Sequence, residues 1–305
     1  MEGDHNSVWE SNRLKTDRLH CPGNVMGSNP IGPTFIPLNI SGMKLRKQDV
    51  SRKIRIPTAL DERLAEDIGI QVGDGSVLTY KYGDDSDYVI GVCGHRIEDR
   101  PYLENFVRPL KKSLFNLDLK LHQSIISGSC FLKLNSKTIV SFYHDVIGLP
   151  IGKKHDISVP LLIRKAPEEI TSAFLRGLGD TDFSLSFIKK TKVHHKYPVL
   201  HLGCQSKPLI SQVDLLLNKL GINAATCFDC EEFDSRTGKT YIKQNLYISG
   251  KHELKVWMKK IGFHNPVQYT RYLIWDKFGF CPPKTNLSQR MQILDGIVDP
   301  EKFDS

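Results

Sequence analysis

The sequence has no long run of hydrophobic residues and few cysteines. The chain of 305 residues contains 7 cysteines, scattered along its length, and 40% hydrophobic residues. A helix that crosses a bilayer needs about 20 consecutive apolar residues, so the pattern argues against a membrane protein. Sparse cysteines indicate a reducing, cytoplasmic setting rather than a disulfide-rich secreted protein. The first residues, Met1–His5, also lack the basic-then-apolar layout of a secretory signal.

Acidic residues are in short supply as well. The chain has 34 Asp and Glu against 42 Lys and Arg, which gives a formal net charge of +8. This excess favours a polyanionic partner such as nucleic acid. The apolar content is that of an ordinary globular chain, which excludes disorder throughout. The length fits one large domain or two medium ones.

Residues 1–42 show no helical or strand period and are rich in Gly, Pro, Asn and Ser. Such a composition does not build a hydrophobic core, so we predict that this segment lies outside the fold. It is either a disordered extension or a segment that is not natively translated. Met26–Ile31 can be encoded by a stem-loop resembling the T-arm of a tRNA, which would place the natural start at Met43. The nucleotide sequence decides between the two.

From Met43 onward the chain becomes regular. A basic lead-in, Met43–Arg55, precedes the first of two segments in which apolar residues recur at four-residue spacing, as on one face of a helix. These residues are Leu60, Leu64, Ile68 and Val72 in the first segment and Ile170, Phe174 and Leu178 in the second. Thr58 and Asp61 resemble a capping box at the start of the first helix. The two helices end in turn-forming stretches that carry Asp74 and Asp182.

The segments that follow the two aspartates also correspond. After Asp74 we expect strands and helices at Val77–Tyr82, Tyr88–Val92, Pro101–Phe115, Leu117–Ile126, Phe131–Asn135 and Thr138–Ile147. After Asp182 we expect them at Phe183–Lys189, Tyr197–Leu202, Lys207–Leu220, Asn223–Cys230, Tyr241–Ser249 and Lys251–Ile261. Both halves therefore read α-β-β-α-β-β-α, and this duplication predicts a monomer with pseudo-twofold symmetry.

The repeated order predicts an α+β fold in which each half is a four-stranded antiparallel sheet backed by helices. We assign residues 43–160 to the first repeat with its basic lead-in and residues 161–265 to the second. Residues 266–305, with a helix at Leu287–Leu294, form a C-terminal tail that we expect to pack on the second repeat.

Small residues occupy matching places in the two helices. Residues four positions apart share a helix face, and small side chains there let two helix backbones approach closely. We call these four residues the helix seam: Gly69, Gly73, Gly177 and Thr181. If the two faces meet, Asp74 and Asp182 emerge side by side, and paired carboxylates favour a divalent cation. Alternatively each aspartate merely ends its helix in a turn, but their matching places in a duplicated unit argue against that.

Two motifs carry a family resemblance. Asp67–Gly75 reads DIGIQVGDG and Leu175–Phe183 reads LRGLGDTDF. Together with their spacing and flanking elements, they resemble the two signature motifs of LAGLIDADG homing endonucleases, in the single-chain, two-repeat form common in archaeal introns. The resemblance covers residues 50–265.

This resemblance implies a pair of saddle-shaped sheets that grips a long duplex DNA target, with the host intron RNA as a possible further partner. It implies that the motif acids Asp74 and Asp182 bind Mg²⁺, with two or more ions shared between them. The backbone carbonyls of Gly75 and Phe183 are further ligands by the same resemblance. The implied reaction is hydrolysis of one phosphodiester in each strand, in support of intron homing. Closely spaced metal ions suit such a displacement.

The sequence departs from the family pattern in two respects. Phe183 stands where glycine is usual, and a bulky side chain there could distort the site. The family commonly places a Lys or Gln near the end of the second strand of each repeat, where this sequence has Gly94 and His95 in the first repeat and Cys204 and Gln205 in the second. The candidates near the attacking water are therefore His95, Gln205 and Lys207. Asp180 corresponds to Val72 in the first repeat, which indicates a local structural role. These departures keep open an alternative function: a catalytically weakened nucleic-acid-binding protein, either an RNA-splicing maturase or a DNA-binding regulator.

Strands of the two predicted sheets alternate between apolar and polar residues, which predicts one face toward the core and one toward DNA. Leu117–Ser124 and Tyr241–Ile248 show the alternation. The segment 189–196 is rich in Lys and His and is the expected clamp on the DNA backbone. The candidate DNA-binding residues are Lys81, Arg96, Lys120, His122, Lys133, Asn135, Ser184, Ser186, Lys189, Lys190, Lys192, His195, Lys196, His201, Lys243, Asn245 and Tyr247.

Cys227 and Cys230 form a C-x-x-C pair. No second pair and no suitably spaced His completes a zinc site. A packed thiol pair or a disulfide therefore fits the pattern better than a metal site.

Overall fold

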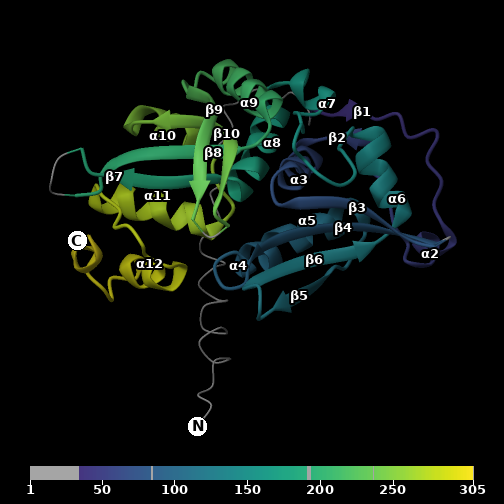
Figure 1. Ribbon diagram of the computed structural model, residues 1–305, viewed down its shortest axis with the longest axis horizontal. Helices are drawn as coiled ribbons and strands as arrows, with labels where there is room; N and C mark the ends of the chain where they lie inside the picture. The colour runs from purple at the N-terminus through teal and green to yellow at the C-terminus, as the bar shows by residue number, and fades with distance from the viewer. Residues whose placement is uncertain (1–33, 84, 191–193, 236, 305) are drawn as a thin grey trace, which may run out of the picture.

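The computed structural model describes residues 34–83, 85–190, 194–235 and 237–304. They form two four-stranded antiparallel sheets and one short two-stranded sheet, with helices packed on them (Figure 1). The predicted α+β fold, with a four-stranded antiparallel sheet in each half, is confirmed. None of the helices in these ranges has the length and apolar character needed to cross a membrane.

The first repeat has its strands in the spatial order β3-β4-β6-β5. Its elements are α3 (Glu62–Val72), β3 (Gly75–Tyr82), β4 (Asp85–His95), α4 (Arg100–Tyr102), η2 (Leu103–Val107), α5 (Arg108–Phe115), β5 (Lys120–Ser124), β6 (Ser129–Asn135), α6 (Lys137–Ser141) and η3 (Phe142–Val146). The helix predicted at Pro101–Phe115 is the run α4-η2-α5, which widens to a π-helix in its middle. Pro109, near the start of α5, cannot donate a backbone hydrogen bond and clashes with the preceding turn, which accounts for the widening.

The second repeat has the corresponding strand order, β7-β8-β10-β9. After the linker helix α7 (Leu161–Arg164), its elements are α8 (Glu168–Thr181), β7 (Phe183–Ile188), β8 (Tyr197–Cys204), α9 (Lys207–Lys219), β9 (Ala225–Asp234), β10 (Lys239–Ser249) and α10 (Lys251–Lys260). In Figure 1, α3 and α8 lie side by side at the centre, between the two sheets. The same order of elements in both halves is what a duplicated unit produces.

The N-terminal boundary predicted at Met43 is wrong for residues 34–42. β1 (Ile36–Pro37) pairs with β2 (Ala59–Leu60), and the Leu38 N–H donates to the Thr58 carbonyl at 2.9 Å. Leu38 is buried in the core. A two-residue strand is too short to show a period, which is why the sequence pattern missed it. The preceding residues 1–33, which we also assigned outside the fold, lie outside the described residues.

Two local predictions also need correction. The cap of α3 is Asp61, whose side chain accepts a hydrogen bond from the Leu64 N–H, and Thr58 plays no part in it. The strand predicted at Leu117–Ile126 is reduced to Lys120–Ser124, and Ile125 and Ile126 lie exposed in the turn that follows. That turn contains Gly128 at φ +63°, a conformation that glycine adopts without strain.

The C-terminal segment contains α11 (Pro266–Phe278), α12 (Leu287–Leu294) and η4 (Pro300–Phe303). The sequence patterns predicted α12 but not α11. Gln268 of α11 accepts from the Leu185 N–H at 2.9 Å and donates to the Phe183 carbonyl at 3.0 Å. Because β7 is the outer strand of its sheet, these bonds satisfy backbone groups that no neighbouring strand reaches. The segment therefore packs on the second repeat by backbone recognition.

Candidate active site at the paired helix ends

The helix seam holds α3 and α8 in backbone contact. A Cβ atom at Gly69 would lie 2.1 Å from the Phe174 carbonyl oxygen, and one at Gly177 would lie 2.0 Å from that of Glu66. A Cβ at Gly73 would lie 2.0 Å from the Thr181 hydroxyl. Real side chains cannot occupy such spaces, so only glycine permits this approach. All four seam residues therefore lie where the two motif helices touch.

Asp74 and Asp182 follow directly from these touching helices. The Asp182 carboxyl carbon lies 3.4 Å from the position of a Cβ on Gly73, so this carboxylate sits against the end of the other repeat's helix. Burial raises the pKa of Asp74 to about 8, with further contributions from the carboxylates of Asp182 and Asp99. Burial also raises the pKa of Asp182 to about 6. The two carboxylates are thus brought together in a poorly solvated place where ionising both is unfavourable.

Lys154, from the linker between the repeats, is the cation beside this pair. Its Nζ donates to the carbonyls of Gln71, Val72 and Gly73 at 2.9, 3.0 and 2.6 Å, which satisfies the free carbonyls at the end of α3. The Lys154 charge opposes the rise in the pKa values of both Asp74 and Asp182. Burial lowers the pKa of Lys154 itself, against the pull of the two aspartates.

Sequence reasoning missed Lys154. It lies in an aperiodic stretch, Gly152–Lys154, and nothing local distinguishes it from the adjacent Lys153. One signal was available: the linker between two repeats runs near the pseudo-twofold axis that relates them, so a lysine in this linker can lie close to both aspartates.

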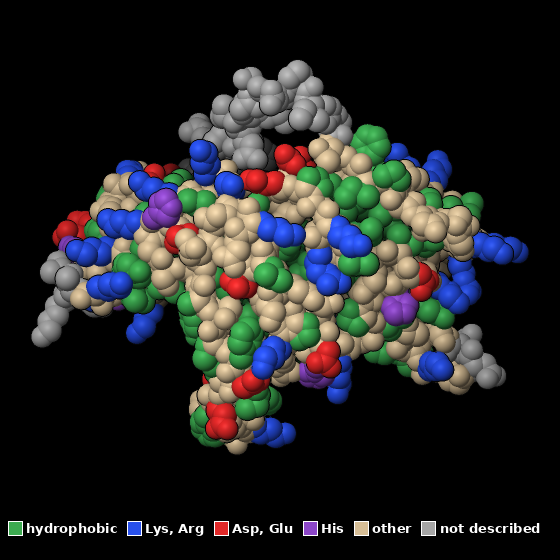
Figure 2. Space-filling view, turned by 90° about the horizontal axis from the view of Figure 1, so that it is seen from above, with side chains coloured by type: hydrophobic (Ala, Val, Ile, Leu, Met, Phe, Trp, Pro, Cys, Tyr) green, Lys and Arg blue, Asp and Glu red, His purple; other side chains and the backbone are tan. Residues whose placement is uncertain are grey.

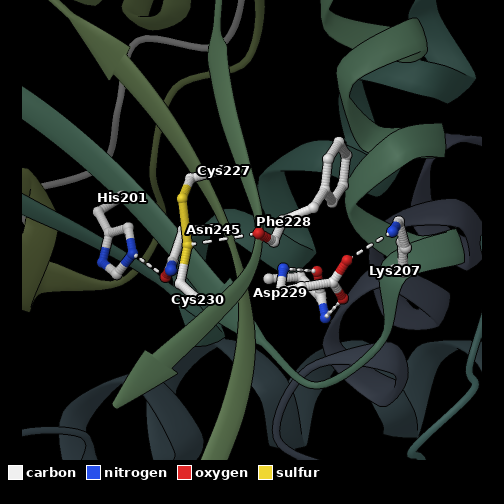
Figure 3. Close-up of a disulfide and its surroundings, with 8 residues drawn as sticks. His201, Lys207, Cys227, Phe228, Asp229, Cys230 and Asn245 are labelled. Carbon is white, nitrogen blue, oxygen red and sulfur yellow. Dashed lines mark hydrogen bonds and ion pairs between the residues drawn. A yellow bond between two sulfur atoms is a disulfide. The ribbon is translucent and has the colours of Figure 1, made fainter.

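The predicted catalytic candidates have other partners. Lys207 pairs with Asp229 at 2.8 Å and lies over the Phe228 ring, as Figure 3 shows. The His95 ring accepts hydrogen bonds from the N–H groups of Ile97 and Glu98 in its own turn, at 3.4 and 3.2 Å. Among the described residues, no hydrogen bond or ion pair joins Lys207 or His95 to either aspartate.

Gln205, the remaining catalytic candidate, contacts His155 of the linker. Phe183, the departure from the family pattern, has its side chain buried in the core against Trp257, with ring centroids 5.1 Å apart. The bulky ring therefore points away from the candidate site. The Phe183 carbonyl already accepts from Gln268, so the aspartate side chains are the stronger ligand candidates. The Gly75 carbonyl remains a proposed ligand.

A second acidic cluster lies deeper, around Glu66, Asp180 and His264, whose side chains are close enough to surround a cation. Their oxygens are already occupied. Glu66 accepts from Arg176 at 3.0 and 2.9 Å and contacts His264 at 2.6 Å. Asp180 accepts from the N–H groups of His264 and Asn265 at 3.0 and 2.9 Å, and burial raises its pKa to about 7. The cluster is therefore a polar network that ties the start of α11 to the motif helices.

The first sheet gathers several of the candidate DNA-binding residues on its exposed face. Lys120 and Lys133 are direct cross-strand neighbours, and His122 stacks on Phe131 with ring centroids 5.5 Å apart. Asn135, exposed at the end of β6, lies on the same side as Lys133 by strand alternation. Lys81 shares the side of Val77, which faces the core, so it is exposed only at the outer end of β3. Arg96 lies half-buried in the turn after β4.

The second sheet presents a row centred on His201. Ser184 and Tyr247 flank it in register, and the His201 and Tyr247 rings stack with centroids 4.6 Å apart. Asn245 is buried, and its side-chain oxygen lies 2.9 Å from the His201 Nε2 (Figure 3). Asn245 therefore positions His201. Ser186 is exposed one step further along β7.

Several candidate cations of the second repeat have internal partners. Lys243 pairs with Glu232 at 2.7 Å. His195 contacts the Asp304 carboxylate at 2.5 Å. Lys190 lies 3.3 Å from the centre of the Tyr197 ring, and Lys189 donates to the Asp304 carbonyl at 3.4 Å. In the predicted clamp, only Lys196 is exposed without such a contact among the residues that are described; Lys192 lies outside them.

Cys227 and Cys230 form a disulfide, with Cα atoms 6.6 Å apart, which confirms the disulfide alternative. The bond lies on β9, where the pairing with β10 shifts register between Lys243 and Asn245 (Figure 3). It therefore closes a bulge in the outer strand of the second sheet.

Comparison with known proteins gives one family match. Residues 169–262 match the family described as "LAGLIDADG-like domain". The match spans α8 to α10 and includes the second of the two motifs. The resemblance predicted from the motifs is thereby confirmed for this domain.

Two curated relatives are both named replicative DNA helicase DnaB. The one from Nostoc sp. is 29% identical over 141 residues, which cover 46% of this chain and 15% of the relative. The one from Synechocystis sp. is 26% identical over 245 residues, which cover 74% of this chain and 26% of the relative. The chain therefore spans only a small part of the length of these relatives.

Solved structures are similar at low sequence identity. I-DmoI in complex with DNA and Mn is 21% identical, with a TM-score of 0.46, and the match covers 66% of this chain and 96% of that one. I-SmaMI bound to an uncleaved DNA target with calcium ions is 14% identical, with a TM-score of 0.47 and coverages of 78% and 94%. The LAGLIDADG homing endonuclease I-GzeII in complex with a DNA target is 11% identical, with a TM-score of 0.48 and coverages of 80% and 94%.

Proposed function

Starting from the LAGLIDADG-like domain at residues 169–262, we propose that the chain is a site-specific endonuclease that cleaves both strands of duplex DNA, one phosphodiester in each, in support of intron homing. The observation that carries this proposal is the pair Asp74 and Asp182. Each repeat contributes one carboxylate to the same poorly solvated place, at the ends of two helices in backbone contact. A pseudo-twofold pair of acids suits a pseudo-twofold substrate with one scissile bond per strand.

The residues fit a divalent metal. Both side chains offer hard oxygen ligands of the kind that Mg²⁺ prefers, and their raised pKa values indicate an electrostatic demand for positive charge that Lys154 alone does not meet. We propose that Asp74 and Asp182 hold Mg²⁺, with two or more ions shared between them. When bound, the metal would activate a water and neutralise charge on the attacking and leaving oxygens.

Lys154 has a distinct role in this proposal. Its ammonium group holds the three last carbonyls of α3 and so fixes the helix end from which Asp74 emerges. It also supplies a positive charge next to the site where phosphate charge develops. The exposed faces of the two sheets, with Lys120, Lys133 and His201, would contact the duplex on either side of this centre.

The test is cleavage of a randomised library of duplexes in plasmids, with Mg²⁺, followed by sequencing of the ends. The chain should cut a long, specific site, and Asp74→Asn or Asp182→Asn should abolish cutting while duplex binding persists. Asp276→Asn, which removes an exposed carboxylate on α11, is the matched control and should cut normally. Cutting that survives both motif substitutions would overturn the assignment.

A second candidate function is supported by the other positions of Lys207 and His95, which leave the site short of the usual side chains near the attacking water. The chain would then be a non-catalytic nucleic-acid binder, such as an RNA-splicing maturase or a DNA-binding regulator. In the same experiment it would bind nucleic acid and cut no member of the library.

A further inference from the structure

The segment of residues 44–55, which we call the basic arm, carries six basic side chains: Lys44, Arg46, Lys47, Arg52, Lys53 and Arg55. All six are exposed. The single acid of the arm, Asp49, is buried and accepts a hydrogen bond from the Thr138 hydroxyl at 2.6 Å. The arm therefore presents positive charge to solvent and turns its negative charge inward.

The charge of the arm is uncompensated. Some other surface cations pair with acids, such as Lys207 with Asp229 and Lys260 with Glu168. Among the residues that the structure describes, none of the ion pairs involves a side chain of the basic arm. Six like charges within twelve residues repel one another, which destabilises the segment unless a polyanion neutralises them.

The arm is fixed at one end of the molecule. The Arg52 guanidinium donates to the carbonyl of Asn135, the last residue of β6, at 2.7 Å. The Asn116 side chain donates to the Lys53 carbonyl at 2.9 Å, and the Arg55 N–H donates to the Phe115 carbonyl at 3.0 Å. Figure 1 shows α2 (Lys47–Ser51), the helix within the arm, at the end of the molecule far from the second repeat. Figure 2 shows Lys and Arg side chains projecting from that end.

The sheet register places this end relative to the candidate active site. Asn135 pairs with Val89, and Val89 pairs with Leu78. Leu78 lies four residues along β3 from Asp74, which corresponds to roughly 13 Å of strand. With a rise of about 3.4 Å of helix axis per base pair, this is about four base pairs from the centre. The arm extends outward from there, past the end of the sheet.

We propose that the basic arm is an additional DNA-binding surface, which contacts phosphates of the duplex flanking the first-repeat half of the target. The inference rests on the proposed function and goes beyond it, because these residues lie outside both sheets. The contact is to the backbone and adds affinity without reading sequence. In the second repeat, the described side chains of the basic segment 189–196 have internal partners except Lys196, so the footprint on DNA should be longer on the side of the arm.

The test compares two triple variants. Lys44→Gln, Lys47→Gln and Lys53→Gln remove three of the six positive charges of the arm and leave its three arginines, including the contact of Arg52, in place. Lys251→Gln, Lys255→Gln and Lys259→Gln neutralise three exposed lysines of α10 and serve as the charge-matched control. The probe is a 40-base-pair duplex selected from a randomised library on the unmodified chain. The readouts are the dependence of affinity on KCl concentration and the hydroxyl-radical footprint.

The slope of log affinity against log salt should become less steep by up to about 2.7 in the arm variant, because each lost phosphate contact contributes about 0.9. Protection should disappear on one side only, from about four base pairs outward, while the centre stays protected. The control should change neither readout.

Three outcomes overturn the proposal. If the unmodified chain binds the duplex and the arm variant matches the control, the arm does not contact DNA, and the proposed function stands. If the arm variant loses affinity for a single-stranded RNA of the same sequence but not for the duplex, the arm is an RNA-binding surface. If the unmodified chain binds no duplex at all, the proposed function fails together with this inference.

Discussion

At the scale of single residues, Asp74 and Asp182 lie in a buried place where the ionised carboxylate is poorly solvated. The folded protein raises the pKa of Asp74 to about 8, far above the usual range of an aspartate, chiefly through burial. The folded state therefore binds more protons than the unfolded state between about pH 4 and pH 8. Stability without metal must then fall as the pH rises through this window, since ionising the pair in the folded protein is unfavourable.

Asp74→Asn should consequently stabilise the metal-free protein at pH 8 and have little effect at pH 5, where Asp74 is already protonated. The gain should be about 2–4 °C in Tm for each kcal/mol of repulsion removed. Thermal unfolding in EDTA at the two pH values measures it. Asp276→Asn should show no such pH-dependent difference. A lower Tm for Asp74→Asn at pH 8 would contradict the inference that ionised Asp74 and Asp182 destabilise the folded protein.

Adjacent lysines allow a matched test of Lys154. Lys154→Met removes three hydrogen bonds to the end of α3 and a basic side chain that lowers both aspartate pKa values. We expect cleavage to slow by about 10²–10³-fold, the usual cost of losing a preorganised electrostatic group at a reaction centre. Lys153→Met, at the neighbouring exposed position, should cut at the normal rate. Equal rates for the two variants would remove Lys154 from the site.

At the scale of elements, the contact between α3 and α8 depends on glycines, which have no side chain to keep the two backbones apart. Gly177→Ala would place a Cβ 2.0 Å from the Glu66 carbonyl oxygen, where neither backbone can yield without moving a helix. The expected destabilisation is about 1–3 kcal/mol or more, as for other overpacked interiors. Urea unfolding measures it. Gly42→Ala, at a position with no atom within 4 Å of the added Cβ, should leave the midpoint unchanged.

The helices and strands also show how much of the secondary structure local sequence patterns predict. Four-residue apolar spacing and alternation predicted every strand of both sheets and both motif helices, because each buries one face against the same core. The strand β1 was missed because two residues are too few to show a period. The helix α11 was missed because the face that it buries includes the polar residues Gln268 and Thr270, which interrupt the apolar spacing. Boundaries shifted where turns ended strands early, as at Ile125.

At the scale of the whole molecule, the C-terminal segment joins the two repeats. Arg290 of α12 is fully buried and donates to Thr270 at 2.9 Å and to Glu98 of the first repeat at 3.2 Å. The Glu98 carboxylate also accepts from the Leu287 N–H at 2.9 Å. Asn265, which caps α11, donates to Asp99 at 3.1 Å. Segments far apart in the chain thus meet beside the candidate site.

Arg290→Met should therefore destabilise the whole protein, by about 1–3 kcal/mol, because Thr270 and the partly exposed Glu98 lose the hydrogen bonds that the buried guanidinium donates. The loss should appear as a lower urea midpoint for the entire transition. Lys302→Met, at an exposed position of the same segment, is the control and should change it little. If the two variants unfold alike, the C-terminal segment does not hold the repeats together.

The duplicated order of elements, the glycines of the helix seam and the two aspartates that follow it could all be predicted from the sequence. These features are local or repeat at matching places, so spacing alone reveals them. Which charges surround the aspartates depends instead on the three-dimensional fold. Lys154 reaches them through a linker, whereas Lys207 and His195 are bound by Asp229 and Asp304. The environment of a charge depends on which distant segments fold beside it, and no local pattern encodes that.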